Sequence, residues 1–328
     1  MRTLLLSVYL VIWAVPGYSQ TSTLPAPGFH HLHLNSVDPE MAIDFYTRQF
    51  PSAAKGTFAG QPALQVRKVW VLFTKVSKPP AIEPQTAYWH FGWNVQDTRK
   101  NLEAYRQRKD VHLRPLYTGD GDNTVFVSSD TWPGAAGTLG RTLPQIAEAK
   151  AKGIQPTRVG GFAYMNGPDR ALVEYAGNYP VERFNHVHMY QEDPLCAQLW
   201  YQKHLQAAPR EGAPLAPDVT ETHCKVPAAD KGWPGLEREG LSRVPAAGVL
   251  FDDVAMNWYV NPGAQPLAPT RGHLADHVGL SVANLDAWMA KLRKEGVKFL
   301  GKPYKLGDSR AIMIQGPSRE AIELVEIH

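Results

Sequence analysis

Two histidines followed by one glutamate occur in the same order in each half of this 328-residue chain. The six residues are His31, His90 and Glu174, then His186, His277 and Glu323. Two imidazoles and one carboxylate on one face of a metal ion leave positions open for a substrate, which suits Fe(II) and is tolerated by other divalent ions. A structural zinc site would instead fill four positions and would usually include cysteine. The pattern therefore predicts open metal sites, with Fe(II) favoured and Mn, Zn or Ni as alternatives.

Two more histidines, His33 and His188, stand two residues after the first histidine of each set. Alternation along a strand puts them on the same face as that histidine. They are candidate catalytic acid–base groups or partners of the metal ligands, and a hydrogen bond within the barrel is the competing interpretation. Aromatic residues near these strands would form either an aromatic-walled cleft or core: Trp89, Trp93, Trp258 and Tyr259.

The set of ligands is doubled because the chain repeats itself. Residues 29–46 and 184–201 are identical at seven of eighteen positions, at a constant offset of 155. Two further segment pairs repeat in the same order: 89–95 with 276–282, and 167–174 with 316–323. An internal repeat of this kind indicates two related halves, which meet near residues 177–180.

Each half contains two units of a strand followed by a helix. The runs at 29–35 and 184–190 are strand-like, and Asp38 and Asp193 are predicted helix N-caps with proline in the first turn. The same unit starts again at Trp89 and at His277. Further strand-like runs follow the helices: 64–75, 124–128, 162–165, 172–175, 249–252, 255–260, 311–314 and 321–327. The chain therefore predicts four βαβββ modules, paired two by two.

These segments resemble the vicinal oxygen chelate superfamily, which includes glyoxalase I, the bleomycin- and fosfomycin-resistance proteins and type I extradiol dioxygenases. The resemblance covers about residues 29–327. It rests on the openings at 31–46 and 186–201, on Asp276-His277-Val-Gly-Leu-Ser-Val282, and on the closing Gly-Pro-x-Arg-x-x-x-Glu of each half. It implies an α+β fold of eight-stranded curved sheets, each built from a pair of modules around one metal.

By the family pattern each half would form one domain with its own metal. Residues 20–178 would hold one ion on His31, His90 and Glu174, and residues 179–328 would hold the other on His186, His277 and Glu323. Glyoxalase I takes a carboxylate from the last strand of both modules, but residues 69–74 and 254–260 contain no carboxylate. The pattern is that of the dioxygenases and the fosfomycin-modifying transferases. If one site works alone, the second half is favoured.

The resemblance implies a metal-dependent enzyme acting on a small substrate with adjacent oxygens. Dioxygenase-type chemistry, for example on a catechol-like compound, is the first expectation. A lyase, isomerase or transferase is one alternative, and a non-catalytic protein that sequesters a small molecule is another. An oligomer is compatible with all three.

Composition and the N-terminus set the context. A formal charge of +3, 44% hydrophobic and 20% charged residues indicate a globular protein, and nothing demands nucleic acid. Residues 1–19 have the anatomy of a secretory signal peptide, and no later apolar run could span a membrane. We therefore expect a secreted or periplasmic protein, in which Cys196 and Cys224 either pair or stay free. Long insertions at 119–160 and 209–247 are either lids or neutral turns.

Overall fold

The computed structural model describes residues 24–116, 124–130, 148–149, 151–155, 160–177, 179–210, 215–226 and 246–327. The predicted signal peptide lies outside these residues, and so does much of both insertions. Within the part of the chain described, no helix is both long enough and apolar enough to cross a membrane.

Four βαβββ modules make up the described fold, as predicted. The first contains β1 (Gly28–Ser36), α1 (Pro39–Gln49), β2 (Ala53–Phe58), β3 (Gln61–Val66) and β4 (Val69–Lys75). The second contains β5 (Tyr88–Asn94), α2 (Thr98–Arg106), β6 (His112–Arg114), β7 (Phe162–Asn166) and β8 (Leu172–Ala176). The third contains β9 (Arg183–Gln191), α4 (Pro194–Leu205), β10 (Ala208–Pro209), β11 (Ala247–Phe251) and β12 (Val254–Val260). The fourth contains β13 (Ala275–Val282), α5 (Leu285–Lys294), β14 (Tyr304–Leu306), β15 (Ser309–Gln315) and β16 (Ala321–Glu326).

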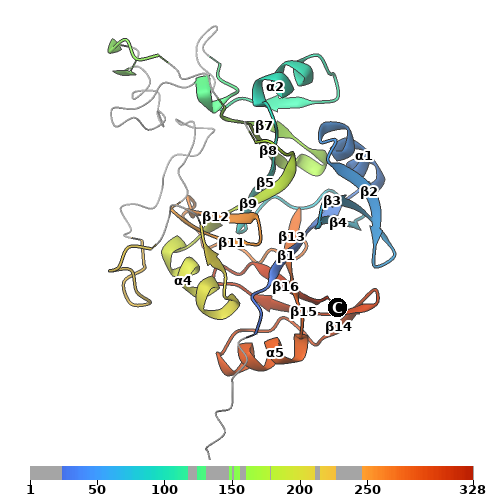
Figure 1. The fold of residues 1–328 in the computed structure, drawn as a ribbon, viewed down its shortest axis with the longest axis vertical. Helices are drawn as coiled ribbons and strands as arrows, with labels where there is room; N and C mark the ends of the chain where they lie inside the picture. The colour runs from blue at the N-terminus through green and yellow to red at the C-terminus, as the bar shows by residue number, and fades with distance from the viewer. Residues whose placement is uncertain are drawn as a thin grey trace, which may run out of the picture.

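The modules pair across the halves of the sequence. Sheet 1 has the order β14-β15-β16-β13-β1-β4-β3-β2 and therefore joins the first module to the fourth. Sheet 2 has the order β10-β11-β12-β9-β5-β8-β7-β6 and joins the second module to the third. Figure 1 shows this directly, because β1 at the blue end of the chain lies beside β13 near the red end, with β16 next in the sheet. The predicted boundary at residue 178 therefore does not separate the two sheets, since each sheet takes one module from each half.

The two sheets are equivalent in construction. In each, two first strands meet antiparallel at the centre, β1 with β13 and β5 with β9. Each first strand also pairs in parallel with the last strand of its own module, as β1 does with β4. A repeated sequence offers the same pairing edge twice, so the first module could pair with either the second or the fourth without changing its own pattern.

Local sequence signals explain most element ends. Asp38 caps α1, because its side chain accepts a hydrogen bond from the Met41 N–H at 3.1 Å. Asp193 has the capping position of α4 but makes no capping hydrogen bond, and its carboxylate accepts from the Val226 N–H at 2.9 Å instead.

Some strand predictions were wrong in detail. The run at 64–75 is split into β3 and β4 by a turn in which Arg67 has φ +59°. The strand expected at 124–128 is absent from that described segment, where only a single bridge and a short 3-10 helix occur. The short strands β2, β6, β10 and β14 lack a strong apolar alternation, and so the sequence analysis missed them.

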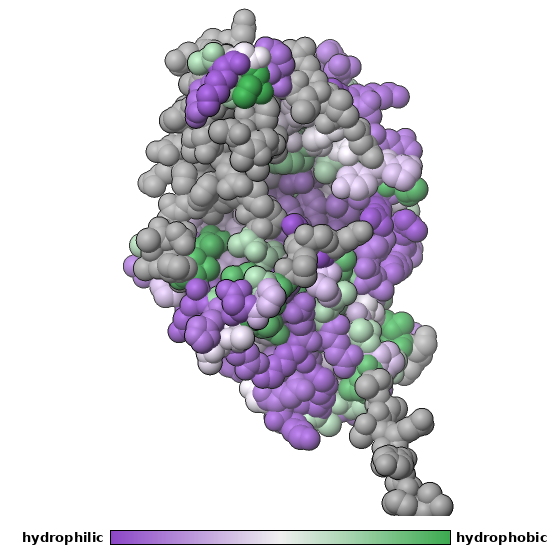
Figure 2. Space-filling model, turned by 60° about the vertical axis from the view of Figure 1, so that its left-hand side comes forward, coloured by the Kyte–Doolittle hydropathy of each residue, from purple (hydrophilic) through white to green (hydrophobic). Residues whose placement is uncertain are grey.

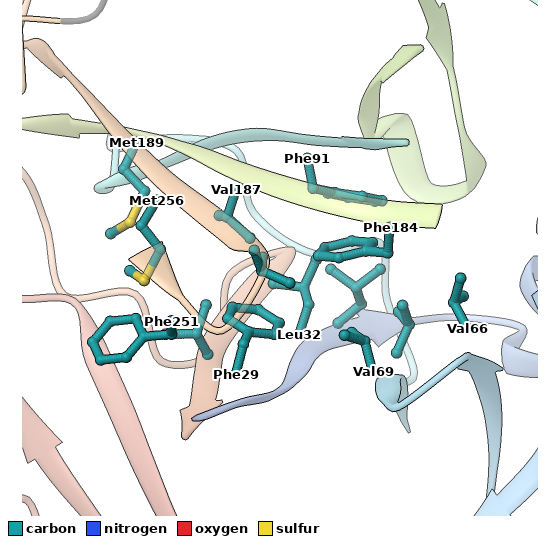
Figure 3. Close-up of a cluster of buried hydrophobic side chains, with 14 of the residues drawn as sticks. Phe29, Leu32, Val66, Val69, Phe91, Phe184, Val187, Met189, Phe251 and Met256 are labelled. Atoms are coloured by element: carbon teal, nitrogen blue, oxygen red, sulfur yellow. The ribbon is translucent and has the colours of Figure 1, made fainter. Parts of the chain in front are cut away.

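One hydrophobic core joins the sheets. Leu32 and Phe29 of sheet 1 meet Phe184 and Val187 of sheet 2, as Figure 3 shows, and all four belong to one buried cluster. The rings of Phe29 and Phe184 stack with centroids 5.9 Å apart. Because alternate residues of a strand face opposite ways, the packing of Leu32 turns His31 and His33 to the other face of β1. A register shift between Phe29 and His31 breaks the alternation there, so Phe29 can lie on the core side with Leu32. We call that other face of each sheet its ligand face.

The two modules of the first half lie in different sheets but still touch through this core. Phe50 at the end of α1 stacks on Trp93 of sheet 2, with centroids 4.2 Å apart and planes 3° apart. Trp93 and Trp258 are fully buried, so both are core rather than cleft residues. Tyr88 adds a polar link, because its hydroxyl donates to the Ala321 carbonyl and accepts from the Val278 N–H, each at 2.9 Å.

Cys196 and Cys224 form a disulfide, with Cα atoms 4.8 Å apart. The bond ties α4 to the segment 215–226, which also supplies the Val226 N–H to Asp193. Around this framework the outer surface shown in Figure 2 is largely hydrophilic, with small apolar areas between.

Candidate metal centres

The predicted ligands gather into two groups on the ligand faces. His31, His277 and Glu323 meet on sheet 1 and form what we call centre 1. His90, Glu174 and His186 meet on sheet 2 and form centre 2. All six side chains are buried. The two groups occupy equivalent strands, so the repeat of the sequence is also a repeat of the site.

The grouping differs from the expectation. We expected His90 and Glu174 to join His31, but they join His186, and His277 and Glu323 join His31 instead. The physical reason is the pairing of modules across the halves. Each centre consists of a first-strand histidine from one half and a histidine and glutamate from the other. The question of which half holds a single working site therefore has no meaning here, because no centre lies within one half.

Centre 1 brings its candidate ligand atoms together but gives them no hydrogen-bond partners. Nε2 of His31 lies 3.3 Å from Oε2 of Glu323, and Nε2 of His277 lies 3.9 Å from the same oxygen. All three atoms are buried and have no hydrogen-bond partner. Ligands about 2.1 Å from a common ion stand about 3 to 3.5 Å apart. Unpaired buried groups at close to that spacing fit a shared cation.

Centre 2 has a similar geometry. Nε2 of His90 lies 3.1 Å from Oε2 of Glu174, and Nε2 of His186 lies 3.7 Å from Oε1 of the same carboxylate. The Nε2 atom of His186 is buried without a partner. Nδ1 of His188 comes within 4.0 Å of Glu174. Four side chains with metal-binding atoms therefore converge at this centre.

A glycine in each centre makes room for an imidazole of the other half. A Cβ atom added to Gly279 would overlap the ring of His31, and one added to Gly92 would overlap the ring of His186. Both glycines lie two residues after a ligand histidine, in the segments that repeat in the sequence. Packing across the paired strands therefore explains why both repeated segments have glycine at this position.

Neighbouring groups orient the ligand rings. Nδ1 of His277 lies 2.6 Å from Oδ1 of Asp276, which leaves Nε2 for a metal. Nδ1 of His186 lies 2.9 Å from Oδ1 of Asn185, and Nδ1 of His31 lies 2.7 Å from Nδ1 of His30. Because ligands need a free lone pair, these contacts favour Nε2 as the metal-binding atom in all three.

Burial keeps His31, His90 and His186 neutral near pH 7. It lowers the pKa of His90 to about 3 and that of His186 to about 4. Burial, with the neighbouring imidazole of His277 second, holds the pKa of His31 well below its usual range. A neutral imidazole is the form that binds a metal, so near pH 7 these rings are ready to do so.

Burial also raises the pKa of Glu174 and of Glu323 above the ordinary carboxyl value. Tyr164 lies beside Glu174, and the hydroxyl of Tyr304 donates to Oε1 of Glu323. A positive ion between the ligands would compensate the same burial cost, because it favours the ionised carboxylate.

The two candidate catalytic histidines lie beside the centres. His33 stacks on His277 with centroids 4.5 Å apart, and its Nε2 lies 2.7 Å from Oγ1 of Thr74. His188 stacks on His186 at 4.2 Å. Its Nε2 lies 2.9 Å from Nδ2 of Asn257 and its Nδ1 lies 3.3 Å from the Tyr259 hydroxyl. Both rings are thus held by hydrogen bonds and still contact a ligand.

Several residues near the centres were not identified from the sequence. Asp276 was quoted only as part of a repeated segment, and Tyr164, Tyr304 and Asn257 were not singled out at all. Asp276 could have been found, because it immediately precedes a ligand histidine. Tyr304 lies on β14, the second strand of its module, whereas Tyr164 lies on β7, the third strand of its module. The sequence repeat therefore does not align these two residues.

Solved structures share this fold. Neither a family model nor a curated protein sequence matches the chain. Glyoxalase I from Zea mays is similar with a TM-score of 0.58 at 13% identity, covering 92% of each chain. A candidate dioxygenase from Bacillus subtilis is similar with a TM-score of 0.54 at 9% identity, covering 93% of this chain and 86% of its own. The chain therefore has the vicinal oxygen chelate fold, as the sequence resemblance implied.

Proposed function

We propose that this protein is a metal-dependent enzyme that binds a small substrate through two adjacent oxygens, with dioxygenase-type chemistry favoured. The observation that carries the proposal is the convergence of two imidazoles and one carboxylate at each of two buried centres. In centre 1 the three ligand atoms are also left without any hydrogen-bond partner. Buried polar atoms are costly unless something pairs with them.

The ligand set favours Fe(II) among the divalent ions. Two histidines and one glutamate leave open positions for substrate, and a bound ion would supply Lewis acidity or a place for O₂. His31, His277 and Glu323 would hold it in centre 1. His90, Glu174 and His186 would hold it in centre 2. Mn, Zn or Ni would fit the same donors.

The remaining groups of each site would handle protons and orientation. His188 lies within 4.0 Å of Glu174 and is fixed by Asn257 and Tyr259, so it is placed to take a proton from a bound substrate. His33, held by Thr74, would do the same in centre 1. His188 is buried, which would keep bulk water from that group, whereas His33 is only partly buried.

A lyase, isomerase or transferase is the second candidate. It is supported by the fold shared with glyoxalase I of Zea mays, although neither β4 nor β12 supplies a carboxylate here. A non-catalytic sequestering protein would not need two complete sets of ligands, so we place it last.

We further propose that the protein works outside the cytosol. The Cys196–Cys224 disulfide supports this, because such bonds persist mainly in oxidising compartments. The signal-peptide-like sequence of residues 1–19 supports the same location.

Elemental analysis of the purified protein tests the proposal and the grouping of ligands together. We expect up to two divalent ions per chain in the wild type. The double variant His31→Ala/His277→Ala should lose one ion, because both residues belong to centre 1. The double variant His31→Ala/His90→Ala should lose both.

The exposed His112 provides a matched control, since His112→Ala should lose no metal. A wild type without metal after reconstitution with Fe(II), Mn, Zn and Ni in turn would overturn the proposed function. Loss of one ion in His31→Ala/His90→Ala and of both in His31→Ala/His277→Ala would show that the ligands group by halves after all.

A further inference from the structure

The two centres have the same ligands but differ in the wall beside them. Three positions near the candidate catalytic histidine can be compared by strand register and by the repeat. The equivalent pairs, sheet 2 first, are Trp89 with Asp276, Tyr190 with Asn35, and Tyr259 with Thr74. Every one of these positions is aromatic in sheet 2 and polar in sheet 1.

The sheet 2 residues form one aromatic surface, which we call the aromatic wall: Trp89, Tyr190 and Tyr259. The rings of Trp89 and Tyr190 stack with centroids 5.1 Å apart and planes 22° apart. Tyr259 meets Trp89 edge-on at 5.0 Å. Trp89 also contacts the ligand His90 at 4.4 Å. Trp89 is only partly buried, so this ring of the wall is accessible to a ligand.

The sheet 1 residues instead make polar contacts with neighbouring groups. Oδ1 of Asp276 lies 2.6 Å from Nδ1 of His277 and 2.7 Å from Nε of Arg271. Nδ2 of Asn35 donates to the His273 carbonyl at 2.7 Å. Asn35 and Asp276 are buried. These three positions of sheet 1 therefore offer no ring on which a ligand could stack.

We propose that the two centres bind different ligands. Centre 2 takes a planar aromatic compound whose adjacent oxygens reach His90, Glu174 and His186, while its ring packs against the wall. Centre 1 takes a small ligand without a ring. This inference rests on the proposed function, because it needs a metal at each centre. Aromatic packing of this kind is worth up to about tenfold in affinity.

Binding of two probes to the Zn²⁺-loaded protein tests this inference. One probe is 4-nitrocatechol, which is aromatic and carries adjacent oxygens, and the other is oxalate, which carries adjacent oxygens without a ring. Calorimetry should show that Trp89→Leu and Tyr190→Leu weaken nitrocatechol binding about tenfold and change oxalate binding less than twofold. Trp200→Leu is the matched control, because Trp200 packs on Tyr201 and His204 away from either centre.

Variants of single ligands assign the probe to a centre. We expect His90→Ala to abolish nitrocatechol binding and His277→Ala to leave it intact, with the metal content of each variant measured in parallel. Retention of nitrocatechol binding in His90→Ala would overturn the inference. Equal weakening of both probes in Trp89→Leu and Tyr190→Leu would do so too, because it would make the wall a structural feature. Failure of the proposed function would be seen separately, as wild-type protein that holds no metal.

Discussion

The imidazole of His31 lies against the backbone of Gly279, a residue 248 positions later in the chain. This contact exists because β1 pairs with β13. The equivalent contact of His186 with Gly92 lies in sheet 2, where β5 pairs with β9. In both centres the ligand histidine of one half needs the absence of a side chain in the other half.

Replacing this glycine should damage one centre selectively. Gly279→Ala would push the His31 ring away from its position, so we expect the metal affinity of centre 1 to fall at least tenfold and centre 2 to stay occupied. The free energy of unfolding should fall by about 1 to 3 kcal/mol, the usual cost of overpacking. Metal titration and thermal denaturation measure the two effects.

Gly301→Ala is the control for this substitution. A Cβ at Gly301 meets nothing within 4 Å, and its backbone does not require glycine. If Gly279→Ala bound metal as tightly as Gly301→Ala, the packing of His31 on Gly279 would not matter for the site.

The two ligand glutamates should matter for metal more than for folding. Glu174→Gln and Glu323→Gln keep the shape of the side chain and remove a carboxylate whose burial raises its pKa. We expect each variant to lose one metal ion and to keep a cooperative thermal transition in the metal-free state. Calorimetry of metal-free wild type and variants tests this, and loss of the transition in either variant would make that glutamate structural.

The sequence allowed the ligands and most long strands to be predicted, but not the partners of the modules. Residue type and order were enough to predict His31, His277 and Glu323 as candidate ligands, and the structure brings these three side chains together. Their grouping was wrong because β1 presents one edge, and both β5 and β13 carry a His-x-Gly segment that fits it. The choice between two such edges depends on the whole core, for example on Phe50 stacking with Trp93.

Stability of the metal-free protein should fall as the pH falls from about 6.5 toward 4. His90 and His186 have folded pKa values of about 3 and about 4, below the ordinary value of 6.5. The unfolded chain therefore binds more protons than the folded chain in this window, which favours unfolding at lower pH. Burial raises the pKa of Glu174, and this shift opposes the trend.

Urea denaturation at several pH values measures this dependence. We expect a loss on the order of 5 kcal/mol between pH 7 and pH 4.5 in the wild type, about half of it from each imidazole. His90→Gln should show a shallower slope, because one buried imidazole no longer resists protonation. A slope unchanged in His90→Gln would mean that His90 does not contribute to the acid sensitivity.

The disulfide should stabilise the protein without contributing to either centre. Cys196 and Cys224 are 28 positions apart and link α4 to the segment 215–226, neither of which carries a candidate ligand. Closing a loop of this length stabilises the folded state by about 3 kcal/mol in the chain-entropy view. We therefore expect Cys196→Ser/Cys224→Ser to unfold at lower urea concentration by that free energy and to bind both metal ions normally when folded. Val226→Ala, which keeps the backbone N–H that Asp193 accepts, is the control for local packing. Metal loss in the double serine variant under native conditions would show that the link between α4 and the segment 215–226 also holds centre 2 in place.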